Sequence, residues 1–260
     1  MSIVVPTPPA GHGLLTGRTV LVTAAAGTGI GSATARRCLE EGARVAISDR
    51  HERRVAETAE ALADVTGEKP VTVVCDVTDE DQVQQMVAAT VEAFGRLDVL
   101  VNNAGLGGSV NILEMTDAQW SSVLDVTLNG TFRCTRAALR VMAEQGSGVI
   151  VNNASVIGWR AQKEQAHYAA AKAGVMALTR CSALDVAHLG IRVNAVSPSI
   201  AAHPFLAKVT SDELLDELAG REAFGRAAEP WEIANVIAFL ASDYSSYMTG
   251  EVVSVSSQHA

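Results

Sequence analysis

The stretch Thr23-Ala24-Ala25-Ala26-Gly27-Thr28-Gly29-Ile30-Gly31 joins an aliphatic run to a helix-like segment. Glycines in such a turn let the main chain approach a pyrophosphate closely, and the helix that follows offers free N–H groups and the positive end of its dipole. A tight β–α turn without a ligand is the alternative interpretation, because a glycine cluster alone is weak evidence. Its position between a first strand and a first helix favours a dinucleotide-binding turn.

Aliphatic runs and helical segments alternate along the rest of the chain. The predicted strands are Thr19–Thr23, Arg44–Ser48, Val71–Cys75, Asp98–Val101, Gly148–Asn152, Ile191–Val196 and Val252–Val255. The predicted helices are Ser32–Glu41, Glu52–Val65, Glu80–Phe94, a long helix within Ala118–Glu144, Gln165–His188 and Trp231–Ser242. The strands are near-continuous Val, Ile and Leu, as a parallel sheet buried on both faces requires. This pattern predicts an α/β fold, a doubly wound parallel sheet of about seven strands flanked by helices.

Composition sets the broad class of the 260-residue chain. Residues 1–17 contain several Pro and Gly and predict an irregular N-terminal arm, and residues 18–260 predict a single domain that contains the dinucleotide-binding turn. The formal charge of −9 argues against nucleic-acid binding. Four scattered cysteines fit a reducing compartment better than disulfides. Without a bilayer-length apolar run or a secretory start, we expect a cytoplasmic protein that has no nucleic-acid or membrane partner.

Ligands of such sheets bind at the carboxyl ends of the strands, so the residues there are candidates for a site. Asp49 ends the second predicted strand, where a carboxylate accepts hydrogen bonds from a ribose and repels a 2′-phosphate. Capping of the next helix is the alternative role. Arg50 beside it is able to hold a 2′-phosphate. We expect NAD as the cofactor in preference to NADP.

The third and fourth predicted strands end in further candidates. Asp76 and Val77 follow the third strand, where a carboxylate meets an adenine amino group or, alternatively, caps the next helix. Asn103, Ala104 and Gly105 follow the fourth strand. Side-chain amides there bridge strand ends, and small residues leave room for a cofactor.

Tyr168 and Lys172 are four residues apart in an alanine-rich helical segment and therefore share one face. A free phenol has a pKa near ~10, and a neighbouring ammonium group lowers it toward the range useful for proton transfer. An ordinary surface tyrosine and lysine is the alternative. Ser155 closes the fifth predicted strand, and its hydroxyl group is placed to polarise a carbonyl oxygen or to be a plain loop hydroxyl.

These motifs occur together in one order. Gly27-x-Gly29-Ile30-Gly31, Asn102-Asn103-Ala104-Gly105, Ser155 and Tyr168-x-x-x-Lys172 resemble the short-chain dehydrogenase/reductase family, with a likeness running from about Gly17 to the C-terminus. The resemblance implies a Rossmann fold, an NAD(H) or NADP(H) cofactor and hydride exchange with an alcohol/ketone pair. It implies that Tyr168 is the general acid/base, that Ser155 binds the substrate oxygen and that Lys172 lowers the tyrosine pKa and binds the nicotinamide ribose. The expected cofactor-binding residues are Ala25, Gly27, Thr28, Gly29, Ile30, Asp49, Arg50, Asp76, Val77, Asn103, Ala104, Gly105, Tyr168, Lys172, Pro198, Ala201 and His203.

The chain departs from the family pattern at several positions. The glycine-rich turn has alanines where relatives have Thr-Gly, and it is one residue longer. Thr127 stands where relatives carry a catalytic Asn in the middle helix. Asn129 lies two residues on, about 200° round a regular helix, and only a local π-bulge would bring it to that place. Pro198-Ser199 replaces Pro-Gly, and His203 stands where a Thr often contacts the carboxamide.

We expect an NAD(P)-dependent oxidoreductase that interconverts a secondary alcohol and a ketone. The overall pattern is most similar to 3-oxoacyl-thioester reductases and more faintly to actinobacterial relatives acting on CoA thioesters of steroid-ring fragments. A CoA or ACP thioester is therefore the expected substrate class, with Trp159, Arg160, Gln162 and Gln165 as candidates for the pocket wall. The family likeness implies a homotetramer, and no set of residues has metal-ligand spacing. A catalytically inactive cofactor-binding module is the alternative function.

Overall fold

The fold is built on one parallel sheet. A computed structural model describes residues 5–202 and 217–257. The strands run in the order β3-β2-β1-β4-β5-β6-β7, and every neighbouring pair is parallel. They are β1 (Thr19–Val22), β2 (Arg44–Asp49), β3 (Val71–Val74), β4 (Val99–Asn102), β5 (Gly148–Asn153), β6 (Ile191–Pro198) and β7 (Val252–Val255). The doubly wound sheet of seven strands expected from the sequence is thus confirmed.

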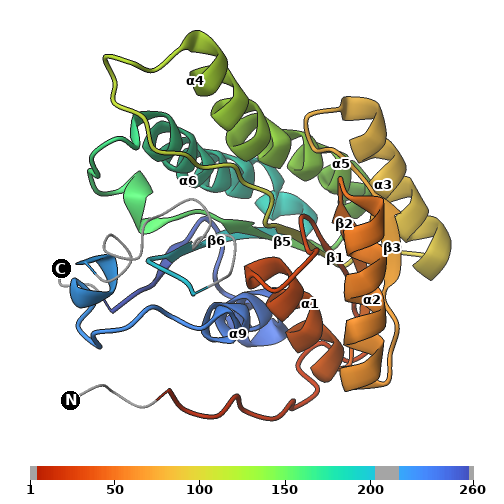
Figure 1. Ribbon diagram of the computed structural model, residues 1–260. Helices are drawn as coiled ribbons and strands as arrows, with labels where there is room; N and C mark the ends of the chain where they lie inside the picture. Colours follow the sequence, from red (N-terminus) through yellow and green to blue (C-terminus); the bar gives the residue numbers. More distant parts are fainter. Residues whose placement is uncertain (1–4, 203–216, 258–260) are drawn as a thin grey trace.

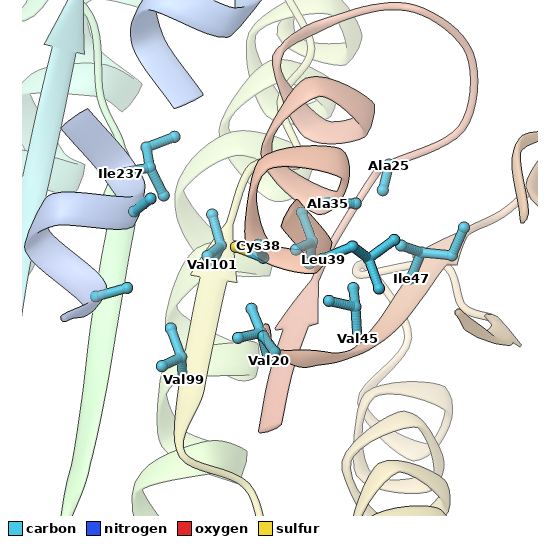
Figure 2. Packing of buried hydrophobic residues seen from close by; sticks show 14 of the residues in the cluster. Val20, Ala25, Ala35, Cys38, Leu39, Val45, Ile47, Val99, Val101 and Ile237 are labelled. Atoms are coloured by element: carbon cyan, nitrogen blue, oxygen red, sulfur yellow. The ribbon is translucent and has the colours of Figure 1, made fainter. Parts of the chain in front are cut away.

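Helices cover both faces of this sheet (Figure 1). One hydrophobic core joins it to α1 (Ile30–Glu40), α2 (Glu52–Thr66) and α9 (Pro230–Ala241). Figure 2 shows part of this core, with Ile237 of α9 and Cys38 of α1 against strand residues such as Val101. On the other face the sheet packs against α3 (Glu80–Phe94), α5 (Gly130–Gln145) and α6 (Ala166–Val186). The strand order reverses between β1 and β4, which opens the crevice where such sheets bind ligands.

Burial of the strands varies with their place in the sheet. Every residue of β1 and β4 is buried, as the continuous aliphatic runs predict. The outermost strand β3 alternates between half-buried and exposed residues, and Val74 is 47% exposed. The sequence pattern of β3 resembles that of the central strands, yet an edge strand lacks a neighbour and is covered less completely. No helix in the described part of the chain has the length and apolar character needed to cross a membrane.

The predicted long helix within Ala118–Glu144 is interrupted. It consists of α4 (Asp117–Leu124), one π-helical turn at Asp125–Asn129 and then α5. Thr116 and Gln119 form a capping box that starts α4. The helix is therefore continuous in path but contains one wider turn, which a regular 3.6-residue periodicity does not reveal.

The described part of the N-terminal arm, residues 5–17, contains no helix or strand, but it is anchored. Glu41 accepts hydrogen bonds from the main-chain N–H groups of His12 (2.8 Å) and Leu14 (2.9 Å) through Oε2. Arg37 pairs with Glu41 and donates to the carbonyl oxygen of Pro9 at 2.6 Å. Both charged side chains are almost fully buried. A buried ion pair on α1 and the residue after it thus holds the arm against the domain.

Candidate active site

A cavity of about 420 Å³ lies at the carboxyl ends of the central strands. It brings together the glycine-rich turn, the segment after β4, the end of β5, the start of α6 and the segment after β6. Its lining includes many of the predicted residues, namely Gly29, Ile30, Asn103, Gly105, Ser155, Gln162, Gln165, Tyr168, Lys172, Pro198 and Ala201. Residues separated by more than a hundred positions in the sequence therefore meet at one crevice.

The glycine-rich turn has no room for larger side chains at its closest approach. A Cβ atom added at Gly31 would lie 2.5 Å from Nδ2 of Asn103 and 2.6 Å from the carbonyl oxygen of Ala24. Ala24 itself has a positive φ of 49°, a conformation that glycine adopts more easily. Gly29 is the N-cap of α1 and brings no capping side chain, so N–H groups of the first turn remain for a ligand. This cradle fits the pyrophosphate of a dinucleotide.

Tyr168 and Lys172 lie in the first part of α6, on the face that lines the cavity. Nζ of Lys172 is 5.6 Å from the centre of the Tyr168 ring and donates a hydrogen bond to the carbonyl oxygen of Asn153. Burial raises the pKa of Tyr168 to about 12 and lowers the pKa of Lys172 to about 8. The expected lowering of the tyrosine pKa is therefore not found: burial raises this pKa, because charging a phenol away from water is costly.

Ser155 follows β5 and adopts an extended backbone conformation, with a φ of −170°. Among the described residues its Oγ makes two long hydrogen bonds, donating to the carbonyl oxygen of Pro198 at 3.5 Å and accepting from the N–H of Ile157 at 3.4 Å. The hydroxyl group is half-buried on the cavity wall. Weak existing bonds leave this hydroxyl free to turn toward a substrate oxygen.

The π-helical turn settles the geometry of the middle helix. Thr127 is fully buried, and its Oγ1 accepts from the N–H of Leu106 (2.9 Å) and donates to the carbonyl oxygen of the same residue (3.1 Å). Asn129 is exposed and donates from Nδ2 to Asp125 at 3.2 Å. The π-bulge that would have brought Asn129 round is present, but Thr127 remains the inward residue. It fastens the segment after β4 to the helix.

Several predicted cofactor residues lie away from this cavity. Ala25 is fully buried in the core, and Gly27 and Thr28 line a different hollow of about 480 Å³ between α1, α2 and α9. That hollow contains neither Ser155 nor Tyr168, so the smaller cavity is the better candidate despite its volume. Ala104 is half-buried and packs against the core on the side of α3, α5 and α6.

The carboxylates at the strand ends, Asp49 and Asp76, are not part of the cavity lining. Asp49 is half-buried, and its Oδ1 accepts from the N–H of His51, the N-cap of α2. Asp76 accepts from the N–H and the hydroxyl group of Thr78. Each carboxylate therefore shapes its own turn, and neither is the N-cap of a helix.

The other predicted cofactor residues, Val77, Arg50 and His203, are not part of the described cavity lining. The side chain of Val77 is buried and leaves no room for a Cβ atom at Gly130, at a distance of 2.6 Å. Arg50 is exposed, with Nε 3.4 Å from the imidazole of His51. His203 lies outside the described residues. Of the predicted pocket-wall residues, Gln162 and Gln165 line the cavity, whereas Trp159 and Arg160 are not part of its lining.

Sequence reasoning missed part of the cavity wall. The unpredicted lining residues include Gly107, Gly108, Ser109, Asn153 and Ile157. Gln165 donates from Nε2 to the carbonyl oxygen of Gly108 at 2.8 Å, and this bond ties the segment after β4 to the start of α6. The run Gly105-Leu106-Gly107-Gly108 directly after a strand was the available signal for this wall. In the described residues no group of three His, Cys, Asp or Glu side chains is placed to hold a metal ion.

Comparison with known proteins bears on the chemistry of this cavity. The family model described as enoyl-(acyl carrier protein) reductase matches residues 24–257. A Mycobacterium tuberculosis protein named (5R,7aS)-5-hydroxy-7a-methyl-1-oxo-2,3,5,6,7,7a-hexahydro-1H-indene-carboxyl-CoA reductase is 65% identical, over 98% of each chain. Cis-4-hydroxycyclohexanecarboxylate dehydrogenase of Sinomonas cyclohexanicum is 44% identical, over 92% of this chain and 94% of that protein. The crystal structure of a short chain dehydrogenase from Mycobacterium smegmatis superposes with a TM-score of 0.88, at 61% identity over 99% of each chain.

Proposed function

The chain is an oxidoreductase of the short-chain dehydrogenase/reductase family, and we propose that it interconverts a ring ketone and the corresponding secondary alcohol on a CoA thioester. The observation that carries the reaction type is the meeting of Tyr168, Lys172 and Ser155 in a cavity that also contains the glycine-rich turn. A nicotinamide dinucleotide supplies or accepts the hydride when bound. Its pyrophosphate would lie at Gly29, Ile30 and Gly31.

The side chains divide the remaining work. With its pKa raised to about 12, Tyr168 is a protonated phenol at neutral pH and holds the proton that the carbonyl oxygen needs during reduction. The hydroxyl group of Ser155 donates to the same oxygen and polarises the carbonyl group. The ammonium of Lys172 stabilises the phenolate that remains after proton transfer.

The similarity of the relatives supports the proposed substrate class. Two of them are named for ring alcohols or ketones that carry a carboxyl group, one of these as its CoA ester. Gly107, Gly108, Ile157 and Leu218 make part of the cavity wall small or apolar, which suits a hydrocarbon ring. Assays with ring-hydroxyl CoA thioesters and with the free acids distinguish the classes, because turnover of the free acids alone would overturn the thioester proposal.

For the cofactor we propose NAD in preference to NADP. The half-buried carboxylate of Asp49 at the end of β2 supports this choice, since a 2′-phosphate beside it would be repelled. The exposed Arg50 is the opposing feature. Calorimetric titration measures the affinities for NADH and NADPH and so compares the effects of Asp49 and Arg50. Tighter binding of NADPH would contradict the proposed preference for NAD.

We also propose a homotetramer in the cytoplasm. Ala166, Ala170 and Ala177 are exposed along α6, and Phe132 of α5 is 41% exposed, which supports close packing against a second copy. Three of the four cysteines are buried as free thiols, in keeping with a reducing compartment. Light scattering coupled to size-exclusion chromatography measures the mass, and a monomer at micromolar concentration would contradict the assembly.

Replacing Tyr168 with Phe tests the proton-transfer role. We expect Tyr168→Phe to lower kcat on the order of 10³-fold, because the variant has no proton to give, while dinucleotide affinity changes little. Tyr247→Phe is the matched control, since Tyr247 is fully exposed and its substitution is expected to leave turnover unchanged. Full activity in Tyr168→Phe would reject the role. Dinucleotide binding without turnover of any carbonyl compound by the unsubstituted chain would instead favour a cofactor-binding module.

A further inference from the structure

Asn153 lies at the end of β5 on the cavity wall, and the reaction described above makes no use of its side chain. Its Nδ2 donates to Oδ1 of Asn103 at 3.0 Å. Asn103 in turn donates from Nδ2 to the carbonyl oxygens of Ala24 (2.9 Å) and Thr23 (3.2 Å). The two amides therefore form a continuous hydrogen-bonded link from β5 to the glycine-rich turn.

The main chain of Asn153 reaches the other half of the cavity. Its carbonyl oxygen accepts the hydrogen bond from Nζ of Lys172, which is itself almost completely buried. One residue thus holds the lysine of the acid/base pair through its backbone and the dinucleotide turn through its side chain. Any displacement of Asn153 would act on both.

The orientation of this amide follows from its partners. Because Asn103 directs its NH₂ group at two carbonyl oxygens, its own oxygen must accept, and the group of Asn153 that meets it must be the NH₂. The remaining atom, Oδ1 of Asn153, is buried and has no hydrogen-bond partner among the described residues. A buried acceptor without a donor is costly, and a ligand that brings a donor recovers that cost.

We propose that Asn153 positions the nicotinamide dinucleotide. Its amide braces Asn103 and the glycine-rich turn, and its Oδ1 accepts a hydrogen bond from a hydroxyl or amide group of the bound dinucleotide. This inference rests on the proposed function, since it places a dinucleotide in this cavity. Asn153 is then a determinant of cofactor affinity and not of carbonyl chemistry.

Asn153→Leu tests the assignment, because the leucine side chain has the same branching and number of heavy atoms but no polar atoms. Titration calorimetry on the full chain uses NAD⁺ and NADP⁺ as probes. For whichever of the two the unsubstituted enzyme binds more tightly, we expect Kd to rise about tenfold, as for the loss of one good hydrogen bond. KM for that dinucleotide rises in parallel, whereas KM for the ketone does not. Asn153→Ser, a smaller change, is expected to shift Kd in the same direction if the leucine variant does not fold.

Thr179→Val is the matched control for a purely structural effect. Oγ1 of Thr179 accepts a buried hydrogen bond from the neighbouring amide, Asn152, at 2.9 Å, away from the cavity lining. Its loss is expected to lower Tm and to change the dinucleotide Kd by less than about twofold. Folded Asn153 variants that bind as the unsubstituted enzyme does, or equal weakening by Thr179→Val, would overturn the assignment. If the unsubstituted enzyme binds neither probe, the proposed function itself fails.

Discussion

Two opposed pKa shifts meet in the acid/base pair. Burial keeps Tyr168 protonated and pushes Lys172 toward its neutral form, with pKa values of about 12 and about 8. In the described residues Lys172 has no carboxylate partner that would hold its charge. Tyr168 therefore stays protonated, and able to donate its proton, throughout the physiological pH range. The positive charge of Lys172, which favours release of that proton, changes with pH much closer to neutrality.

This balance gives ketone reduction a pH dependence. Lys172 loses its charge as pH rises through about 8, while Tyr168 keeps its proton. We expect kcat/KM for reduction to be level below that pH and to fall above it, because the phenolate formed in the reaction loses its stabilising neighbour. Steady-state rates from mildly acidic to mildly alkaline pH give the profile. A rate that climbs through this range would contradict the assigned role of the lysine.

The same burial makes Lys172 a cost to the fold. Its folded pKa lies below the ordinary value of 10.5, so the unfolded chain binds the proton more readily, and stability falls as pH decreases from about 10.5 to about 8. We expect Lys172→Met to raise the free energy of unfolding at neutral pH, on the order of 1–3 kcal/mol, while turnover is lost. Denaturant melts measure this gain. If Lys172→Met raised the free energy of unfolding only at high pH, the destabilising effect assigned to the buried charge of Lys172 at neutral pH would be contradicted.

Among the elements, the π-helical turn between α4 and α5 decides which residue fastens the segment after β4. We expect Thr127→Val to destabilise the fold by about 1–3 kcal/mol and to lower kcat, because the N–H and carbonyl groups of Leu106 lose their partner, the buried hydroxyl group of Thr127. Asn129→Ala is the control, since Asn129 is exposed and its substitution is expected to cost less than about 0.5 kcal/mol. Melting curves and kcat for both variants provide the test. Equal effects of the two substitutions would contradict the proposal that Thr127, and not Asn129, fastens the segment after β4.

The elements themselves were largely predictable from the sequence. Aliphatic runs and turn residues identified all seven strands, and the strand-end rule brought Ser155 and Asn103 to the crevice. The four-residue spacing and the family resemblance, and not that rule, pointed to Tyr168 and Lys172 of α6. From the sequence the π-turn was only a condition for moving Asn129, since the residue types at 125–129 do not distinguish it from a regular helical turn. The direction of the tyrosine pKa shift was wrong for a related reason. Spacing reveals the neighbouring ammonium, but only packing reveals how much water the phenol loses.

At the scale of the whole molecule, the described part of the N-terminal arm has a fixed position on the domain, although its sequence predicts no regular structure. A Cβ atom added at Gly11 would lie 2.0 Å from the carbonyl oxygen of Glu40, so the arm lies directly on the end of α1. Burial raises the pKa of Glu41, but hydrogen bonds from Leu14 and His12 and the charge of Arg37 outweigh it, and the net pKa is lowered. The carboxylate therefore stabilises the fold above its ordinary pKa, and this contribution is lost as pH falls through the lowered value.

Breaking this anchor is expected to affect the whole chain. Glu41→Gln leaves Arg37 buried without its counter-charge, and we expect a loss of about 3–5 kcal/mol together with easier proteolysis of residues 5–17. Glu40→Gln is the matched control, because the adjacent Arg36–Glu40 pair is more exposed and is expected to contribute less than about 1 kcal/mol. Denaturant melts and mass spectrometry of limited digests measure both effects. If the two variants unfold at the same denaturant concentration, the arm is held by its apolar contacts. The buried Arg37–Glu41 pair then makes no net contribution to holding the arm.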